Sequence, residues 1–159
     1  MTDIVDVATR SRMMSGIKGR NTSPEILIRK AMHARGYRFR LHVKGLPGKP
    51  DLVLPKFKSV IFVHGCFWHG HSCRYFKIPN TRHEFWIDKI TNNQKRDEAQ
   101  VLELRALGWR VLIIWECAIR FIKKHQTSAL VDQVSSWLAS GDLHLEIDEK
   151  SLMKMLGKS

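Results

Sequence analysis

The strongest constraint on the fold is a pair of apolar runs separated by one long helical segment. The runs are "SVIFV" at residues 59–63 and "WRVLIIWE" at residues 109–116, and the segment between them has helical periodicity from "RHEFWIDKI" to Gly108, where only "TNN" threatens a break. Two buried strands joined by a long crossover helix favour a sheet that has helices packed on its faces. We therefore expect an α/β fold.

The remaining segments complete this expectation. "NTSPEILIRKAMHARG" predicts a helix that ends at Gly36, "YRFRLHV" alternates like a half-buried strand, and "DLVLP" with "SVIFV" predicts a hairpin or two adjacent strands. Further helices are expected at 119–125 and 128–138, followed by a weak strand at 143–147 and a basic tail. We expect a flexible basic arm over residues 1–20 and, over residues 21–159, a single domain with a central mixed β-sheet flanked by helices.

The charge balance points to a polyanionic partner. Lysine and arginine number 27 against 15 acidic residues, which gives a net charge of +12. Because the basic residues are spread along the whole chain, rather than gathered on one amphipathic helix or tail, nucleic acid is favoured over a membrane surface. No apolar run approaches the roughly 20 residues that would cross a bilayer, and the first residues lack the apolar core of a secretion signal. We expect a cytoplasmic, nucleoid-associated protein.

Soft metal ligands gather in "HGCFWHGHSC", residues 64–73. Three cysteines in a chain that we expect to be cytosolic argue against a disulfide framework. Cys66, His71 and Cys73 with Cys117, which follows the most apolar strand, supply four donors for a structural zinc ion. His69 or His64 could replace His71 as the fourth ligand, and a catalytic zinc is a weaker alternative. The competing interpretation is that the cysteines are small buried side chains.

A second set of residues suits a harder cation and proton transfer. Asp51 opens an apolar strand after Pro50, where a carboxylate suits Mg²⁺ better than packing. A histidine in the loop, His64 or His69, could take a proton from water if an acid such as Asp97 orients it. Taken alone, Asp51 and Asp97 read as ordinary surface acids. Glu25 fits a helix capping box that begins at Thr22 as well as it fits a functional role.

Large aromatic side chains stand next to this set of polar residues. Phe67 and Trp68 are adjacent in a glycine-flanked loop, and Trp86 opens the long helical segment. Two neighbouring rings in an irregular loop are hard to bury in one core, so we expect at least one to be exposed and able to wedge between bases. The alternative is that Phe67 and Trp86 are ordinary core residues.

Taken together, "GKPD", "VIFVHGCFWHGHSC", "FWIDKI" and "GWRVLIIWECAI" resemble the very-short-patch repair endonucleases. The resemblance runs from about Thr9 to Cys117 and implies a restriction-endonuclease-like fold, an α/β architecture with a structural zinc site. It implies an enzyme that nicks one DNA strand 5′ of the thymine in a T:G mismatch, which arises when 5-methylcytosine deaminates. It also implies a monomer, with mismatch-repair proteins and a cytosine-5 methyltransferase system as candidate partners.

The resemblance also implies a role for each site residue. Mg²⁺ is bound by Asp51 and by the backbone carbonyl of Val63, with Glu25 acting through water. His69 activates water and is paired with Asp97, while His64 lies near the scissile phosphate. The remaining roles fall to three groups: zinc is held by Cys66, His71, Cys73 and Cys117, base intercalation is assigned to Phe67, Trp68 and Trp86, and the minor groove is reached by Met14 and Ile17 of the arm.

One departure from the wider restriction-enzyme pattern sharpens the assignment. The usual acid-x-lysine of the second strand is here Phe62-Val63-His64, which carries neither charge. The very-short-patch family shares this departure, which moves proton transfer from lysine to imidazole. Two rivals remain: a noncatalytic zinc-stabilised DNA-binding module, and a restriction endonuclease of the same fold that cuts both strands.

Overall fold

The computed structural model of the chain describes residues 22–124 and 127–157. The expected arm over residues 1–20, with Met14 and Ile17, lies outside these residues. Among the described helices, none is both long and apolar enough to cross a membrane.

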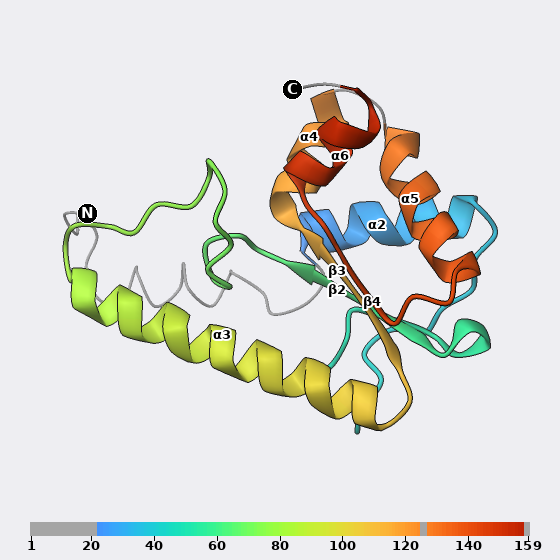
Figure 1. Cartoon of the computed structure of the whole chain (residues 1–159), viewed down its shortest axis with the longest axis horizontal. Coiled ribbons are helices and arrows are strands. Elements are labelled where there is room, and N and C mark those ends of the chain that lie inside the picture. Colours follow the sequence, from blue (N-terminus) through green and yellow to red (C-terminus); the bar gives the residue numbers. More distant parts are fainter. Residues whose placement is uncertain (1–21, 125–126, 158–159) are drawn as a thin grey trace.

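A four-stranded open sheet forms the centre of the molecule (Figure 1). Its strands follow the order of the sequence: β1 (Leu52–Leu54), β2 (Ser59–His64), β3 (Arg110–Trp115) and β4 (His144–Ile147). The hairpin partners β1 and β2 are antiparallel, whereas β2, β3 and β4 run parallel to one another. The prediction of a mixed sheet with a hairpin and a crossover is confirmed.

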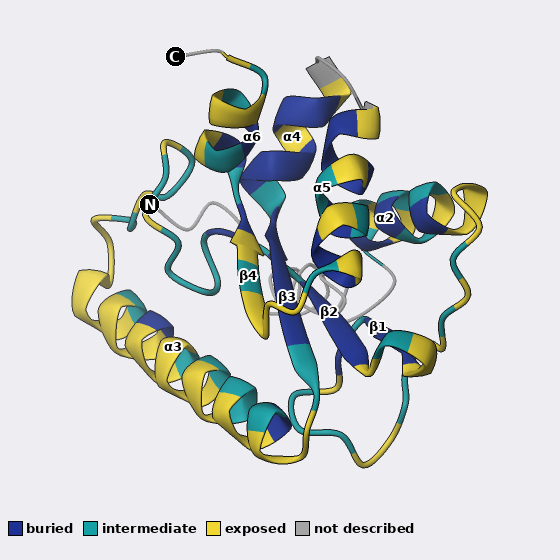
Figure 2. Ribbon diagram, turned by 45° about the vertical axis from the view of Figure 1, so that its right-hand side comes forward, coloured by how far each residue is buried: buried dark blue, intermediate teal, exposed yellow. Residues whose placement is uncertain are grey.

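The helices cover both faces of this sheet (Figure 2). They are α2 (Ser23–Ala34), α3 (His83–Ala106), α4 (Glu116–Lys124), α5 (Thr127–Ala139) and α6 (Glu149–Met155), and a 3₁₀ turn, η1 (Pro55–Phe57), joins β1 to β2. Alternation along β2 explains the two layers. Ile61 packs with residues of α2, α4, α5 and α6, whereas Val60 and Phe62 face Leu104 of α3. The helix α3 thus covers one face alone, and its outer side is exposed.

Three expectations about elements need correction. Residues 37–43 form no strand, because only Arg40 pairs with Val53 before the chain turns at His42, whose φ is +52°. The helix α3 runs unbroken through "TNN". The basic tail contains α6, which Asp148 begins as N-cap in a capping box with Ser151.

Most of the predicted site residues in the described part of the chain lie at one end of the sheet, in β2, in the loop after it or next to a strand end. Cys117 lies in the first turn of α4 directly after β3, and Glu25, Asp97 and Trp86 lie elsewhere on helices. The carboxyl ends of β2 and β3 meet at this end of the sheet, since His64 lies opposite Trp115 in the parallel pairing. The antiparallel partner β1 starts at the same edge and brings Asp51 to it. This convergence brings residues together that are far apart in sequence.

Candidate functional site

Two separate groups of side chains that could hold a metal ion flank the end of β3. In the first, Cys66, His71, Cys73 and Cys117 place one ligand atom each within 4.8 Å of one another. His71 is therefore the histidine that joins the cysteines, and neither His64 nor His69 replaces it. Cys66 and Cys117 are buried, and Cys117 stands in the first turn of α4 directly after β3.

The surroundings of this cysteine-histidine cluster orient its ligands. His71 Nδ1 lies 3.7 Å from Cys117 Sγ, while its other nitrogen, Nε2, lies 3.3 Å from Asp148 Oδ2. The indole of Trp115 stacks on the His71 ring at 4.3 Å with an interplanar angle of 14°. A carboxylate on the far nitrogen of a histidine is the usual arrangement around a metal ligand, because it fixes the tautomer and raises the basicity of the ligand.

The sulfur chemistry of the cluster also fits a cation. A hydrogen bond with Cys66 lowers the pKa of the Cys117 thiol to about 6, and the backbone N–H of Glu149 donates to the same sulfur at 3.3 Å. The Cys66 thiol has a raised pKa for the converse reason, its hydrogen bond with Cys117. The hydrogen bond between Cys66 and Cys117 thus keeps a proton on one sulfur and favours its loss from the other. A bound metal ion would displace the remaining proton. Three sulfurs and one imidazole are a donor set typical of structural zinc.

The loop that carries the cluster is fastened to α3. Asn93 Nδ2 donates to the carbonyl of Trp68 at 2.9 Å, and Gln94 Nε2 donates to the carbonyl of Gly70 at 3.1 Å. Gly70 has φ +65°, and a Cβ there would lie 2.3 Å from Gln94 Nε2, so a side chain would both strain the backbone and collide with the helix. The "TNN" segment therefore anchors the loop instead of breaking the helix.

The second group is His64, His69 and Asp97, whose ligand atoms also lie within 4.8 Å of one another. His69 Nδ1 is 2.5 Å from Asp97 Oδ2, a charge-assisted contact that joins the loop to α3. Because Asp97 accepts a hydrogen bond from Nδ1–H, the Nε2 nitrogen of His69 is the one left with a lone pair. The pair can therefore accept a proton from water at Nε2.

His64 is the buried member of this group. It is 7% exposed, and its ring stacks on that of His69 with centroids 3.8 Å apart and planes 4° from parallel. Burial, and secondly the neighbouring His69, lowers the pKa of His64 to about 3. Its ring is therefore neutral near pH 7, and it supplies hydrogen bonding without positive charge.

A pair of acidic residues lies on the other side of β2. Asp51 Oδ2 accepts a hydrogen bond from the backbone N–H of Val63 at 2.6 Å, which fixes it beside the residue that precedes His64. Burial, and secondly a hydrogen bond with Glu25, raises the pKa of Asp51 to about 8. Glu25 is buried at 2% exposure and forms an ion pair with Arg29 one turn along α2.

This pair of acids suits a hard cation. When two carboxyl groups lie side by side and no cation is bound, the pKa of one of them is strongly raised, as it is for Asp51. Carboxylate oxygens are also the ligands that Mg²⁺ prefers. Thr22 caps α2 through a contact to the Glu25 backbone N–H, and the Glu25 side chain forms a hydrogen bond with Asp51. The contact of Asp51 with Val63 is to its N–H, and the role of the Val63 carbonyl stays a prediction.

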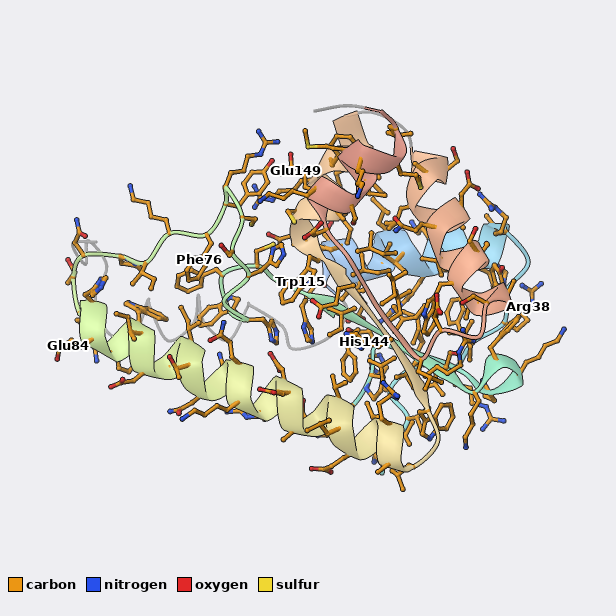
Figure 3. All side chains as sticks on the ribbon, in the orientation of Figure 1. Arg38, Phe76, Glu84, Trp115, His144 and Glu149 are labelled. Carbon is orange, nitrogen blue, oxygen red and sulfur yellow. The ribbon has the colours of Figure 1, made fainter. Side chains whose placement is uncertain are left out.

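The three predicted wedge residues form one aromatic group. The centroid of the Phe67 ring lies 5.2 Å from that of Trp68 and 5.4 Å from that of Trp86, and the two tryptophans are 5.8 Å apart. All three are only partly buried, and Trp86 lies in the first turn of α3, whose amino-terminal end projects beyond the sheet (Figure 1). Phe76, labelled in Figure 3, joins the Phe67 ring at 6.3 Å over the same half of α3.

Four residues near the site were not predicted from the sequence: Arg29, Trp115, Glu146 and Asp148. Arg29 had a usable signal, since it follows Glu25 by four residues on a helix. Asp148 had none as a partner of His71, because the two residues are 77 positions apart. Trp115 Nε1 donates to Glu146 Oε1 at 2.8 Å, a contact between neighbouring strands that follows only from the sheet order.

Comparison with known proteins gives consistent relatives. A family profile described as DNA mismatch endonuclease Vsr matches residues 2–75. The chain is 42% identical over 152 residues to DNA mismatch endonuclease Vsr of Escherichia coli, an alignment that covers 96% of this chain and 97% of the relative. It is 46% identical over 119 residues to the type II nicking enzyme V.XorIIP of Xanthomonas oryzae, which covers 75% of this chain and 88% of that enzyme.

Proposed function

The chain belongs to the DNA mismatch endonuclease Vsr family, and from this premise we propose that it nicks one DNA strand 5′ of the thymine in a T:G mismatch. Family membership makes the protein a DNA endonuclease, a hydrolase of DNA repair, and leaves the noncatalytic binding module without support. The mismatch would arise by deamination of 5-methylcytosine, and the nick would begin very-short-patch repair. A restriction-endonuclease-like fold accords with the four-stranded mixed sheet and its flanking helices.

The observation that carries the proposal is the contact between His69 and Asp97, at the same end of the sheet as the half-buried Asp51. Asp97 accepts a hydrogen bond from Nδ1–H of His69, so Nε2 takes the proton of the attacking water. His64 packs flat against the His69 ring and limits its rotation. As a neutral imidazole it can donate one hydrogen bond to a phosphate oxygen.

Asp51, with Glu25 acting through water, is the proposed holder of Mg²⁺. When bound, Mg²⁺ supplies charge stabilisation to the phosphate and the leaving oxygen. Arg29 stays paired with Glu25 and keeps that carboxylate turned toward Asp51. The proposed role of zinc, held by Cys66, His71, Cys73 and Cys117, is to stiffen the loop that carries His69.

The aromatic group is the proposed reader of the mismatch. Phe67, Trp68 and Trp86 lie edge to face at the projecting end of α3 and present ring surface to solvent. Unstacking a base step costs a few kcal/mol, and the cost is smaller at a mismatched pair. Trp68→Ala is therefore expected to reduce the preference for a T:G duplex over a matched duplex more than it reduces nonspecific binding. Equal losses would contradict this role.

A nicking assay on the zinc-loaded full chain tests the proposed activity. The substrates are end-labelled duplexes that differ only in one T:G or C:G pair, and Mg²⁺ is omitted or added instead of chelated, because a chelator would also compete for zinc. We expect Mg²⁺-dependent cleavage 5′ of the thymine in the T:G duplex only. Cleavage of both strands of the matched duplex would favour a restriction enzyme, and undiminished cleavage by Asp51→Asn would refute the proposed magnesium site.

A further inference from the structure

A cavity of about 360 Å³ lies between α3 and the parallel strands, on the face of the sheet that α3 covers. Its wall includes the group His64, His69 and Asp97, together with Trp115 and His144, both labelled in Figure 3. The cavity is distinct from the cysteine-histidine cluster, which borders another cavity lined by His71, Cys73 and Asp148. Small ions therefore have a path to the histidine group that does not pass the zinc ligands.

The donor atoms of this group are two imidazole nitrogens and one carboxylate oxygen. They lie within 4.8 Å of one another, a spread that small side-chain movements reduce to the separations of ligands on one ion. This donor set suits divalent transition metals such as Ni²⁺, Co²⁺ or Zn²⁺, whereas Mg²⁺ selects oxygen ligands.

A second observation comes from His64. Its side chain is more than nine-tenths buried, and its Nδ1 atom has no hydrogen-bond partner among the described residues. Buried polar nitrogens nearly always have a hydrogen-bond partner, so the unpartnered Nδ1 indicates that a ligand or an ion binds there. A ring held by stacking on His69 and by an edge contact with Trp115 can present a nitrogen to an ion with little further loss of side-chain entropy.

We infer that His64, His69 and Asp97 form a third metal site, which binds a divalent transition-metal ion and inhibits the enzyme. The ion replaces the proton on Nδ1 of His69 and binds the Asp97 carboxylate beside it. The ring proton then sits on Nε2, so His69 loses the lone pair that it needs there as a base. Binding and proton abstraction are then mutually exclusive. The binding itself depends only on the geometry, whereas the inhibition rests on the function proposed above.

The binding is tested on full chain already loaded with zinc at the cysteine-histidine cluster. Equilibrium dialysis against Ni²⁺, with zinc and nickel both counted, should give one additional ion per chain with zinc retained. His64→Gln and Asp97→Asn should each weaken nickel binding by about tenfold or more, while the matched variant His144→Gln, at the wall of the same cavity, should bind like the unaltered chain. Circular dichroism and zinc content verify folding, and Asp97→Asn decides the matter if the buried His64 variant does not fold.

The inhibition is tested by adding Ni²⁺ to the T:G nicking assay at fixed, saturating Mg²⁺. Nicking should fall with the same concentration dependence as nickel binding, and free histidine added as a competing ligand should restore it. The absence of a second ion, or equal nickel binding in all four proteins, would overturn the site. Nickel binding without loss of nicking would overturn the inhibition alone. No nicking with Mg²⁺ alone, beside normal nickel binding, would refute the proposed function and leave the site intact.

Discussion

Two histidines of one short loop differ in which ring nitrogen is free. In His69, Nδ1 contacts Asp97 and Nε2 has the lone pair. In His71, Nε2 contacts Asp148 and Nδ1 faces the sulfur of Cys117. The partner carboxylate therefore decides which residue can act as a base and which can bind metal through Nδ1. Sequence spacing indicates that both histidines matter, but it does not contain this difference.

Replacing each histidine separately tests the division. His69→Ala should reduce nicking by at least about 100-fold, the scale of a lost general base, while zinc stays near one ion per chain. His71→Ala should lose zinc and thermal stability together. Zinc content measured by atomic absorption beside single-turnover nicking distinguishes the two cases, and zinc loss in the His69 variant would mean that the roles are exchanged.

Burial of His64 predicts acid sensitivity. Its pKa falls from 6.5 to about 3 on folding, so between these values the unfolded chain binds a proton that the folded chain does not. His64 therefore does not reduce the free energy of unfolding above pH 6.5. Below that pH the free energy of unfolding declines, by up to about 1.4 kcal/mol per pH unit. Urea unfolding of zinc-loaded protein from pH 7 to about pH 5 should show this slope. His64→Gln should flatten it, and an unchanged slope would place the acid sensitivity elsewhere.

At the scale of elements, β4 supports the site through β3. Glu146 of β4 accepts the indole N–H of Trp115, whose ring stacks on His71 and meets the edge of His64 at 5.4 Å. A hydrogen bond with His144 lowers the pKa of Glu146, which keeps this acceptor ionised. The edge strand thus positions a ring that contacts both clusters.

Glu146→Leu should therefore reduce nicking about 10–100-fold, as loss of outer partners of metal ligands does, and should also destabilise the protein by leaving the buried Trp115 N–H unpaired. Glu146→Gln retains an acceptor and should keep most of both. Single-turnover rates and urea midpoints of the two variants provide the measurement. Equal behaviour of the leucine and glutamine variants would show that the contact has no positioning role.

Which elements could be predicted depended on how local their causes are. Apolar runs and helical spacing predicted the sheet, its hairpin and α3, because these patterns are set within a few residues. The strand expected at 37–43 failed because its alternation has only Val53 to pair with, through Arg40. The anchoring role of Asn93 and the Trp115–Glu146 contact required three-dimensional packing, which no local pattern contains.

At the scale of the whole molecule, the two ends of the sheet have different tasks. The candidate site occupies the end with His64 and Trp115, while the opposite end is closed by Arg110. Its guanidinium stacks on Trp137 and donates to the carbonyls of Trp137, Leu138, Ser140 and Asp142 and to the hydroxyl of Ser59. One planar cation therefore joins two strands to the end of α5.

Arg110→Lys should lower the free energy of unfolding by roughly 2–4 kcal/mol, because an ammonium group cannot satisfy five acceptors spread around a planar fork. The same change at the exposed Arg96 of α3 should alter it by less than about 0.5 kcal/mol. Urea unfolding with zinc content held constant provides the comparison. A loss at Arg110 no larger than that at Arg96 would show that the guanidinium contacts contribute little.

Asp148 is both the N-cap of α6 and the partner of His71, so the last part of the chain contributes to the cysteine-histidine cluster. A truncation of the gene that ends before Asp148 would remove both the carboxylate at His71 and the Glu149 backbone N–H at Cys117. The sulfur would then be left more open to peroxide and to sulfenic acid formation. Selection on the carboxyl-terminal segment is therefore expected to preserve resistance to oxidative damage as well as shape.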